Sequence, residues 1–188
     1  MLMAATALAV GSGADFSASS ANPSNTFSTG SLSMVNAKDT QAILTASAMK
    51  LGDSSRGTVD IANTGASNGS FNVSEQTDSD SGASLAPPHP LAAELNLIIQ
   101  DCGLFTTTTT ANDTPPACPG NNDTSTGQKY SGALNGLGNQ DLGSFAGTDA
   151  QPGGDMHRYK FTVTLPANAD NVFSGLATSV TFNWSAAT

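Results

Sequence analysis

The two cysteines are the residues whose spacing most directly suggests a covalent bond. Cys102 and Cys118 stand sixteen positions apart, across a stretch rich in Thr, Pro and Asn. In an oxidising compartment they would form one disulfide that closes this loop, which the chain-entropy model values at roughly 3 kcal/mol. Zinc binding would need further thiols or imidazoles at ligand spacing, and the two histidines, His89 and His157, supply no such pattern. The cysteines therefore predict a stapled loop and no metal.

One acidic segment has the spacing of part of a calcium loop. Residues 77–82 read Asp-x-Asp-x-Gly from Asp78 onward. A complete loop has a third oxygen donor and a distal bidentate Glu, and both are missing from the segment. We expect an exposed turn here, and the sequence leaves a weak calcium site near Asp78 and Asp80 undecided.

Motifs for catalysis are missing from the chain. It contains no Gly-x-Ser-x-Gly and no His-Glu-x-x-His, and its glycine clusters lack the context of a phosphate-binding loop. We therefore predict no catalytic residue, no cofactor and no enzymatic activity. An activity centred on His89 or His157 would speak against this prediction.

Composition favours one exported β domain. Only 11% of the 188 residues are charged, and 15 acidic against 6 basic residues give a net charge of −9. This field would repel phosphate backbones, so nucleic acid is not an expected partner. The length suits one domain with its own core.

Alternation of apolar and polar residues identifies the elements that position these groups. Phe161, Val163 and Leu165 alternate with threonines, and Val180, Phe182 and Trp184 do the same near the end of the chain. A period of two is typical of half-buried strands. The last two strands of the chain are thus predicted at 158–166 and 175–184.

Further strands are expected upstream. One begins at Leu32 and Met34, and could include Phe27; the others are placed at 43–49 (Ile43, Thr45, Ser47 and Met49), 55–63, 70–75 and 91–100. A short helix is an alternative for 91–100. Residues 106–128 are expected to be a loop, and 134–145 a turn-rich connection that could include one helical turn. Seven to nine strands predict an all-β, single-domain β-sandwich of the jelly-roll or immunoglobulin-like kind over 31–188.

The segment before this domain has two parts. Residues 1–14 are apolar and end in small residues, as in a secretory signal peptide without its basic start. They are interpreted either as a truncated signal peptide or as a retained arm. Residues 15–30 are polar, with isolated Phe16 and Phe27, and form an extended arm with no core of its own to join. No stretch reaches the roughly 18 apolar residues of a transmembrane helix.

The order of several short pieces resembles the TasA/camelysin family of exported fibre proteins. The matching pieces are the small-residue junction before 14–17, then 25–32, 52–65, 142–147, 159–166 and 173–184. The chain departs from the family pattern at Leu51, where a proline usually stands, and in its loop 101–119. Some members have been described as metalloproteases. This sequence has no metal-binding motif, so we do not expect that activity here.

This resemblance implies a fibre that grows by strand donation. The N-terminal arm of one subunit would complete the sheet of the next, giving a head-to-tail homopolymer. The interface candidates are the apolar side chains of the first thirty residues: Leu2, Leu8, Val10, Phe16 and Phe27. The expected location is extracellular, at the cell surface or in a biofilm matrix, with a membrane involved only during export and other matrix components as further partners.

A secreted binding module is the alternative function. Such a module would be monomeric or attached to the cell wall and would bind, for example, carbohydrate. Carbohydrate platforms display several exposed aromatic rings, and this chain has one Trp and two Tyr. The shortage of aromatic residues favours the fibre.

Overall fold

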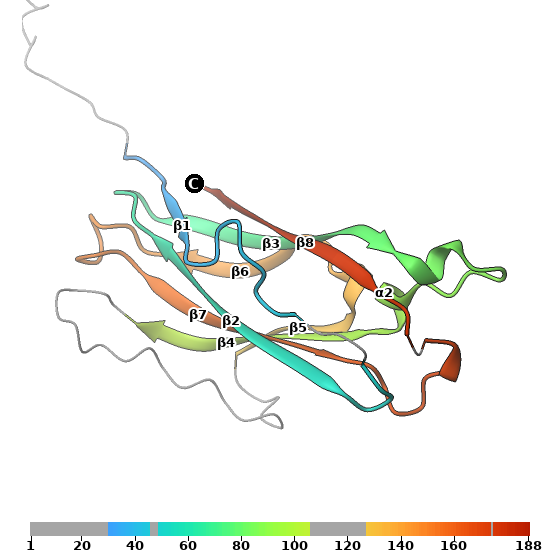
Figure 1. Ribbon diagram of the computed structural model, residues 1–188. Helices are drawn as coiled ribbons and strands as arrows, with labels where there is room; N and C mark the ends of the chain where they lie inside the picture. The colour runs from blue at the N-terminus through green and yellow to red at the C-terminus, as the bar shows by residue number, and fades with distance from the viewer. Residues whose placement is uncertain (1–29, 46–48, 106–126, 174) are drawn as a thin grey trace, which may run out of the picture.

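Strands in which apolar and polar residues alternate form two facing sheets, as the sequence predicts. The structure is a computed structural model and describes residues 30–45, 49–105, 127–173 and 175–188. Five strands form one antiparallel sheet in the order β1-β2-β7-β4-β5, and three form the other in the order β6-β3-β8 (Figure 1). The all-β sandwich is confirmed.

The described strands number eight and the helices are single turns. The strands are β1 (Met34–Asn36), β2 (Ser54–Asn63), β3 (Gly69–Asp80), β4 (Asn96–Phe105), β5 (Gln128–Ala133), β6 (Gln140–Phe145), β7 (Met156–Thr164) and β8 (Thr178–Ala187). The short helices are η1 (Ser81–Ser84), α2 (Leu91–Glu94), η2 (Leu134–Gly136) and η3 (Asn171–Phe173). In the part of the chain that the structure describes, no helix is long and apolar enough to span a membrane.

The core lies between the sheets and is centred on β7. Tyr159, Phe161 and Val163 point inward from β7, and the strands on its two sides add inward side chains at matching register positions. From the three-stranded sheet, Phe71 stacks on Phe145 with ring centroids 4.3 Å apart. Inward side chains from both sheets thus meet in one apolar layer, as expected for a sandwich.

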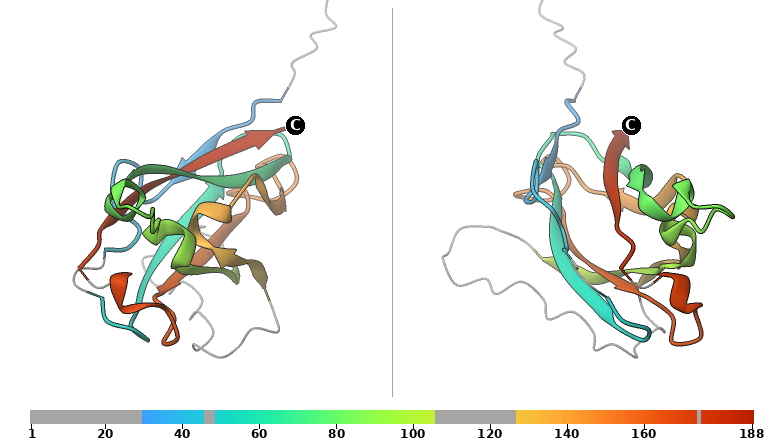
Figure 2. Two further views of the ribbon diagram at one scale, coloured as in Figure 1. Left: turned by 90° about the vertical axis from the view of Figure 1, so that its right-hand side faces the viewer. Right: turned by 45° about the vertical axis from the view of Figure 1, so that its right-hand side comes forward.

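The two closing strands are confirmed and belong to opposite sheets. β7 is the centre of the five-stranded sheet, whereas β8 pairs with β3 at the margin of the three-stranded one. The connection between them includes η3 and carries the chain from one sheet to the other. The last strand ends beside the first described residues, as both views in Figure 2 show.

The strand predicted at 43–49 is wrong for the residues described there. Asn36 instead starts a series of turns: its side-chain oxygen accepts a hydrogen bond from Lys38 N at 2.8 Å, and its carbonyl accepts one from Asp39 N at 3.1 Å. Ile43 and Thr45 follow without ladder pairing. The first strand is also shorter than expected, because β1 begins at Met34 and Leu32 precedes it; Phe27 lies outside the described residues.

Three other boundaries differ from the predictions. The expected turn at 77–82 is strand as far as Asp80, because β3 continues its pairing with β8 to that residue. The segment 91–100 contains both alternatives, with α2 followed by β4. The expected connection at 134–145 contains one helical turn, η2, but also strand β6, which pairs with β3 around a bulge. Of the expected loop 106–128, residues 106–126 lie outside the described residues and Gln128 already belongs to β5.

One side of the sandwich is closed and the other is open. On the closed side, Lys129 of β5 donates a hydrogen bond from Nζ to the carbonyl of Leu142 in β6, at 2.7 Å, and so links the two sheets. Leu134 and Leu137 are buried on the same side. On the open side, β8 faces β1 and the turns that follow it, and a groove lies between them.

Candidate functional site

Most of the predicted site residues fall outside the described part of the chain. This applies to Cys118 and to the five interface candidates of the N-terminal arm: Leu2, Leu8, Val10, Phe16 and Phe27. Cys102 is described and is disulfide-bonded. It lies within β4 and not on a loop as expected, because β4 extends to Phe105 beyond a bulge in its pairing with β7. Its pairing with Cys118 stays a prediction.

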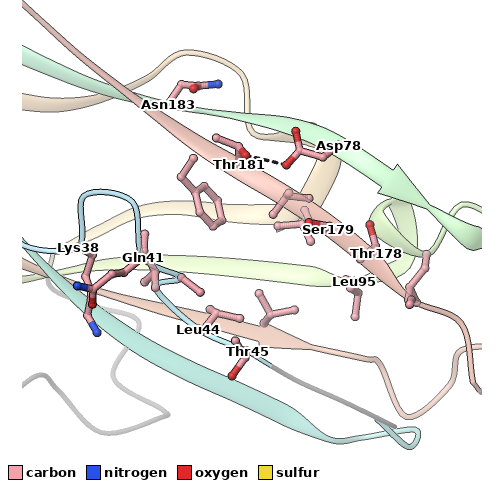
Figure 3. Close-up of a pocket in the computed structure, with 18 of the residues that line it drawn as sticks. Lys38, Gln41, Leu44, Thr45, Asp78, Leu95, Thr178, Ser179, Thr181 and Asn183 are labelled. Carbon is pink, nitrogen blue, oxygen red and sulfur yellow. Dashed lines mark hydrogen bonds between the residues drawn. The ribbon is translucent and has the colours of Figure 1, made fainter.

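A large groove lies on the open side of the sandwich. Its volume is about 1440 Å³. β8 forms one wall from Thr178 to Trp184, and the opposite wall comes from β1 and residues 38–45 (Figure 3). The floor is apolar and is made by Leu91, Leu95, Leu134, Val163 and Leu165.

The wall formed by β8 is a free sheet edge. β8 pairs with β3 along its length, and within the described ranges no strand pairs with its other side. A strand of this kind presents a row of unpaired N–H and C=O groups that can pair with another chain. It is also long, at ten residues, and carries no charged side chain that would deter pairing.

The inward side chains of β8 are incompletely covered. Val180, Phe182 and Trp184 alternate with exposed neighbours and are only half-buried, although they pack against the core. By contrast, Phe71 and Val73 of the neighbouring β3 are fully buried. One more strand beside β8 would cover the exposed parts of these side chains.

The opposite wall is held to β2 and stays apart from β8. Ser55 Oγ donates a hydrogen bond to the carbonyl of Thr45 at 2.8 Å. The carbonyl of Ile43 lies so close to Gly57 that a Cβ at this position would overlap it. Glycine at position 57 thus allows the wall to approach β2, and this leaves the space beside β8 open.

The carboxylates of the acidic segment take part in holding the fold together. The Asp80 carboxylate accepts hydrogen bonds from the backbone N–H groups of Gly82, Leu91 and Ala92, at 2.7 to 3.0 Å. The Asp78 carboxylate accepts one from Thr181 Oγ1 at 2.6 Å. Across the described residues, no group of three or more His, Cys, Asp or Glu side chains could hold a metal ion. Asp80 instead fixes the corner between β3 and α2.

A second polar cluster lies at the other end of the core. The Asp101 carboxylate lies 3.0 Å from His157 Nδ1 and 3.9 Å from Lys129 Nζ, and it accepts a hydrogen bond from Gly103 N at 2.9 Å. Burial by itself would raise the pKa of Asp101, but the hydrogen bonds from His157 and Gly103 and the nearby positive charges outweigh it, so the pKa is lowered. The cluster joins β4, β5 and β7, and Lys129 extends it to β6.

The two histidines belong to different surroundings. His157 is held by Asp101 and lies against the Phe145 ring, with centroids 4.5 Å apart. The His89 ring meets the Phe173 ring edge-on at 5.9 Å. These contacts give each histidine a packing role.

No protein-family model matches the chain, and no curated protein matches it either. A function must therefore be argued from the groove and the free edge of β8. Sequence reasoning missed this site, although the alternation in 178–187 pointed to the strand itself.

Proposed function

We propose that this chain is the structural subunit of an extracellular filament or biofilm matrix fibre. Subunits polymerise head-to-tail, and the N-terminal arm of one subunit adds a strand to the sheet of the next. The observation that carries the proposal is the unpaired edge of β8 beside an apolar, half-covered groove. The resemblance to exported fibre proteins points in the same direction.

The groove fits an extended chain segment better than a compact ligand. A strand beside β8 would find about five N–H and five C=O groups along ten residues, since alternate residues point to each side of an antiparallel strand. At roughly 0.5–1.5 kcal/mol each, about ten hydrogen bonds contribute a gross 5–15 kcal/mol before ordering costs. Backbone pairing supplies affinity, and the apolar floor selects the side chains that face it.

The arm has the composition of such a strand. Residues 1–29 contain one charged side chain, Asp15, and carry Phe16 and Phe27 among small residues. An apolar anchor buried in the groove contributes about 1.5–3 kcal/mol when it leaves water completely. A joint that does not close on itself generates a filament, so one kind of contact is sufficient.

The arrangement of aromatic rings favours the filament over a carbohydrate-binding module. Trp184 packs on Tyr159 and Phe161, with ring centroids 6.4 and 6.1 Å apart. Phe182 packs on Phe161 at 4.8 Å. These rings are turned toward the core and do not form a flat exposed platform on which a sugar would stack.

Negative-stain electron microscopy of purified protein tests the proposal. We expect filaments from the protein with its arm, prepared both with residues 1–14 and without them, and dispersed monomers from a version lacking residues 1–25.

A Phe16→Asp variant should also stay monomeric, because it puts a charge where the apolar anchor is expected. Ser19→Asp is the matched control for charge alone, since a residue three positions along an extended strand points to the opposite face. Monomers from every version across concentration and pH would contradict the proposal.

A further inference from the structure

Building on the proposed strand donation, we infer that the donated strand enters the groove at the Thr178 end of β8 and pairs with β8 in the antiparallel direction. The partner is a second copy of this chain, stacked end to end on the first. The inference rests on where the arm leaves the domain, where the groove lies along β8, and which way β8 runs.

The arm leaves the domain beside the end of β8. Ser67 N donates a hydrogen bond to the Ser31 carbonyl at 3.1 Å, so the first described residues are held next to the start of β3. Leu32 and the Ala187 carbonyl both lie against Gly69. Figures 1 and 2 show the start of the blue ribbon and the C-terminus at the same end of the sandwich.

The groove runs along β8 and continues past the first residue of that strand, at the end opposite to the arm. Its residues on β8 run from Thr178 to Trp184, and Phe173 and Leu176 continue its lining beyond the start of the strand. If subunits stack end to end, the Ala187 end of one faces the Thr178 end of the next. An arm that leaves the first subunit then meets the mouth of the groove in the second.

Chain direction follows from this stacking. In the proposed donation the arm reaches away from its own domain, so its N-terminus would lie farthest into the neighbour and the chain would run back from there. β8 of the neighbour runs the other way, from Thr178 at the entrance to Ala187 at the far end. The two strands are therefore antiparallel, like β3 and β8 on the other side.

Insertion of the arm into its own groove would give the opposite direction. The chain would have to turn back at residue 30 and lie along its own β8, and the two strands would then be parallel. Parallel pairing is slightly less stable per residue. Strand direction therefore distinguishes donation between subunits from self-complementation within one.

The arm is long enough for the donation. β8 has ten residues, which span about 33 Å at about 3.3 Å each. Residues 15–29, taken alone, span about 50 Å when extended. About five residues thus remain to cross from one domain to the next.

Cysteine cross-linking between subunits tests the direction. Ser17 and Asn25 mark the two ends of the arm, and Ser179 and Ser185 mark the two ends of β8 on its exposed face. Each is changed to Cys in a separate chain, arm and β8 variants are mixed in pairs, and the assembled filaments are treated with a short bismaleimide. Because each chain carries one added thiol, a cross-link between an arm and a β8 thiol must join two subunits.

Antiparallel entry predicts two productive mixtures: Ser17→Cys with Ser185→Cys, and Asn25→Cys with Ser179→Cys. If the crossed mixtures react instead, or if filaments form and no mixture reacts, the inferred direction or groove is wrong while strand donation itself can stand. A double variant, Asn25→Cys with Ser185→Cys, that cross-links within single monomers while no filaments form would overturn both proposals.

Discussion

At the residue scale, the charge of Asp101 depends on the fold. Its pKa is below the ordinary value of 3.8 in the folded protein, because hydrogen bonds from His157 and Gly103 outweigh the effect of burial. A carboxyl group with a lowered folded pKa stabilises the fold at any pH above its unfolded pKa. That contribution is lost as the pH falls through the folded value.

We therefore expect Asp101→Asn to lower the free energy of unfolding by about 1.5–3 kcal/mol near neutral pH, the range for a hydrogen bond to a charged group. The difference from the unchanged protein should shrink as the pH falls below about 4, because the carboxyl group then takes up a proton. Urea unfolding at a series of pH values measures this difference. Asp149→Asn, at an exposed turn position, is the control. A difference for Asp101→Asn that grows as the pH falls below about 4 would contradict the assignment.

At the element scale, β8 separates a core face from a solvent face. Val180 lies on the groove side and is half-buried. Asn183 also borders the groove, but its side chain is exposed and points away from it in Figure 3. A lysine at position 180 can keep its ammonium group in water while the groove is empty. An incoming strand would bury that charge, at a cost of several kcal/mol.

Val180→Lys should therefore leave a folded monomer that assembles poorly. Since 1.4 kcal/mol corresponds to a factor of ten in affinity, we expect the critical concentration for filament formation to rise at least about tenfold. Sedimentation measures this concentration, and circular dichroism checks the fold. Asn183→Lys adds the same charge on the opposite face and should assemble normally; equal effects of the two substitutions would show that the groove is not the joint.

At the scale of the whole molecule, the domain is a sandwich with one closed and one open side. The closed side is linked by Lys129 and Leu142, and the open side has the groove. A ligand that binds only the folded state raises its stability by RT ln(1 + [L]/Kd). Under the proposed strand donation, the arm of a neighbour would act as such a ligand for the domain.

A peptide of residues 15–29 should consequently stabilise the version lacking residues 1–25. The expected gain is about 2.7 kcal/mol at a peptide concentration one hundred times its Kd, seen as a rise in Tm. A peptide of the same composition in scrambled order is the control. An unchanged Tm up to the solubility limit of the peptide would argue that the arm does not bind this domain.

Strands that alternate regularly were recognisable from their own residues. Val59 and Ile61, and likewise Phe161 and Val163, face the core as predicted, because an inward face must be apolar whatever strand lies next to it. The alternation at Ile43 and Thr45 led to a wrong strand prediction. The chain turns after Asn36, and this segment pairs with no strand in the described residues. β6 was missed because its apolar and polar residues do not alternate regularly. Gly143 lies within it, and its pairing with β3 shifts register opposite Phe71 and Asn72.

The amino-acid sequence by itself determined the all-β class, the location of most strands and the contrast between a polar, nearly uncharged arm and the domain that follows. These depend on local periodicity and composition, which act within a few residues. The order of the strands in the sheets, the free edge of β8 and the groove were decided only by the tertiary structure. Each of them depends on which distant segments become neighbours, and the alternation along a single strand is the same whether its edge is paired or open.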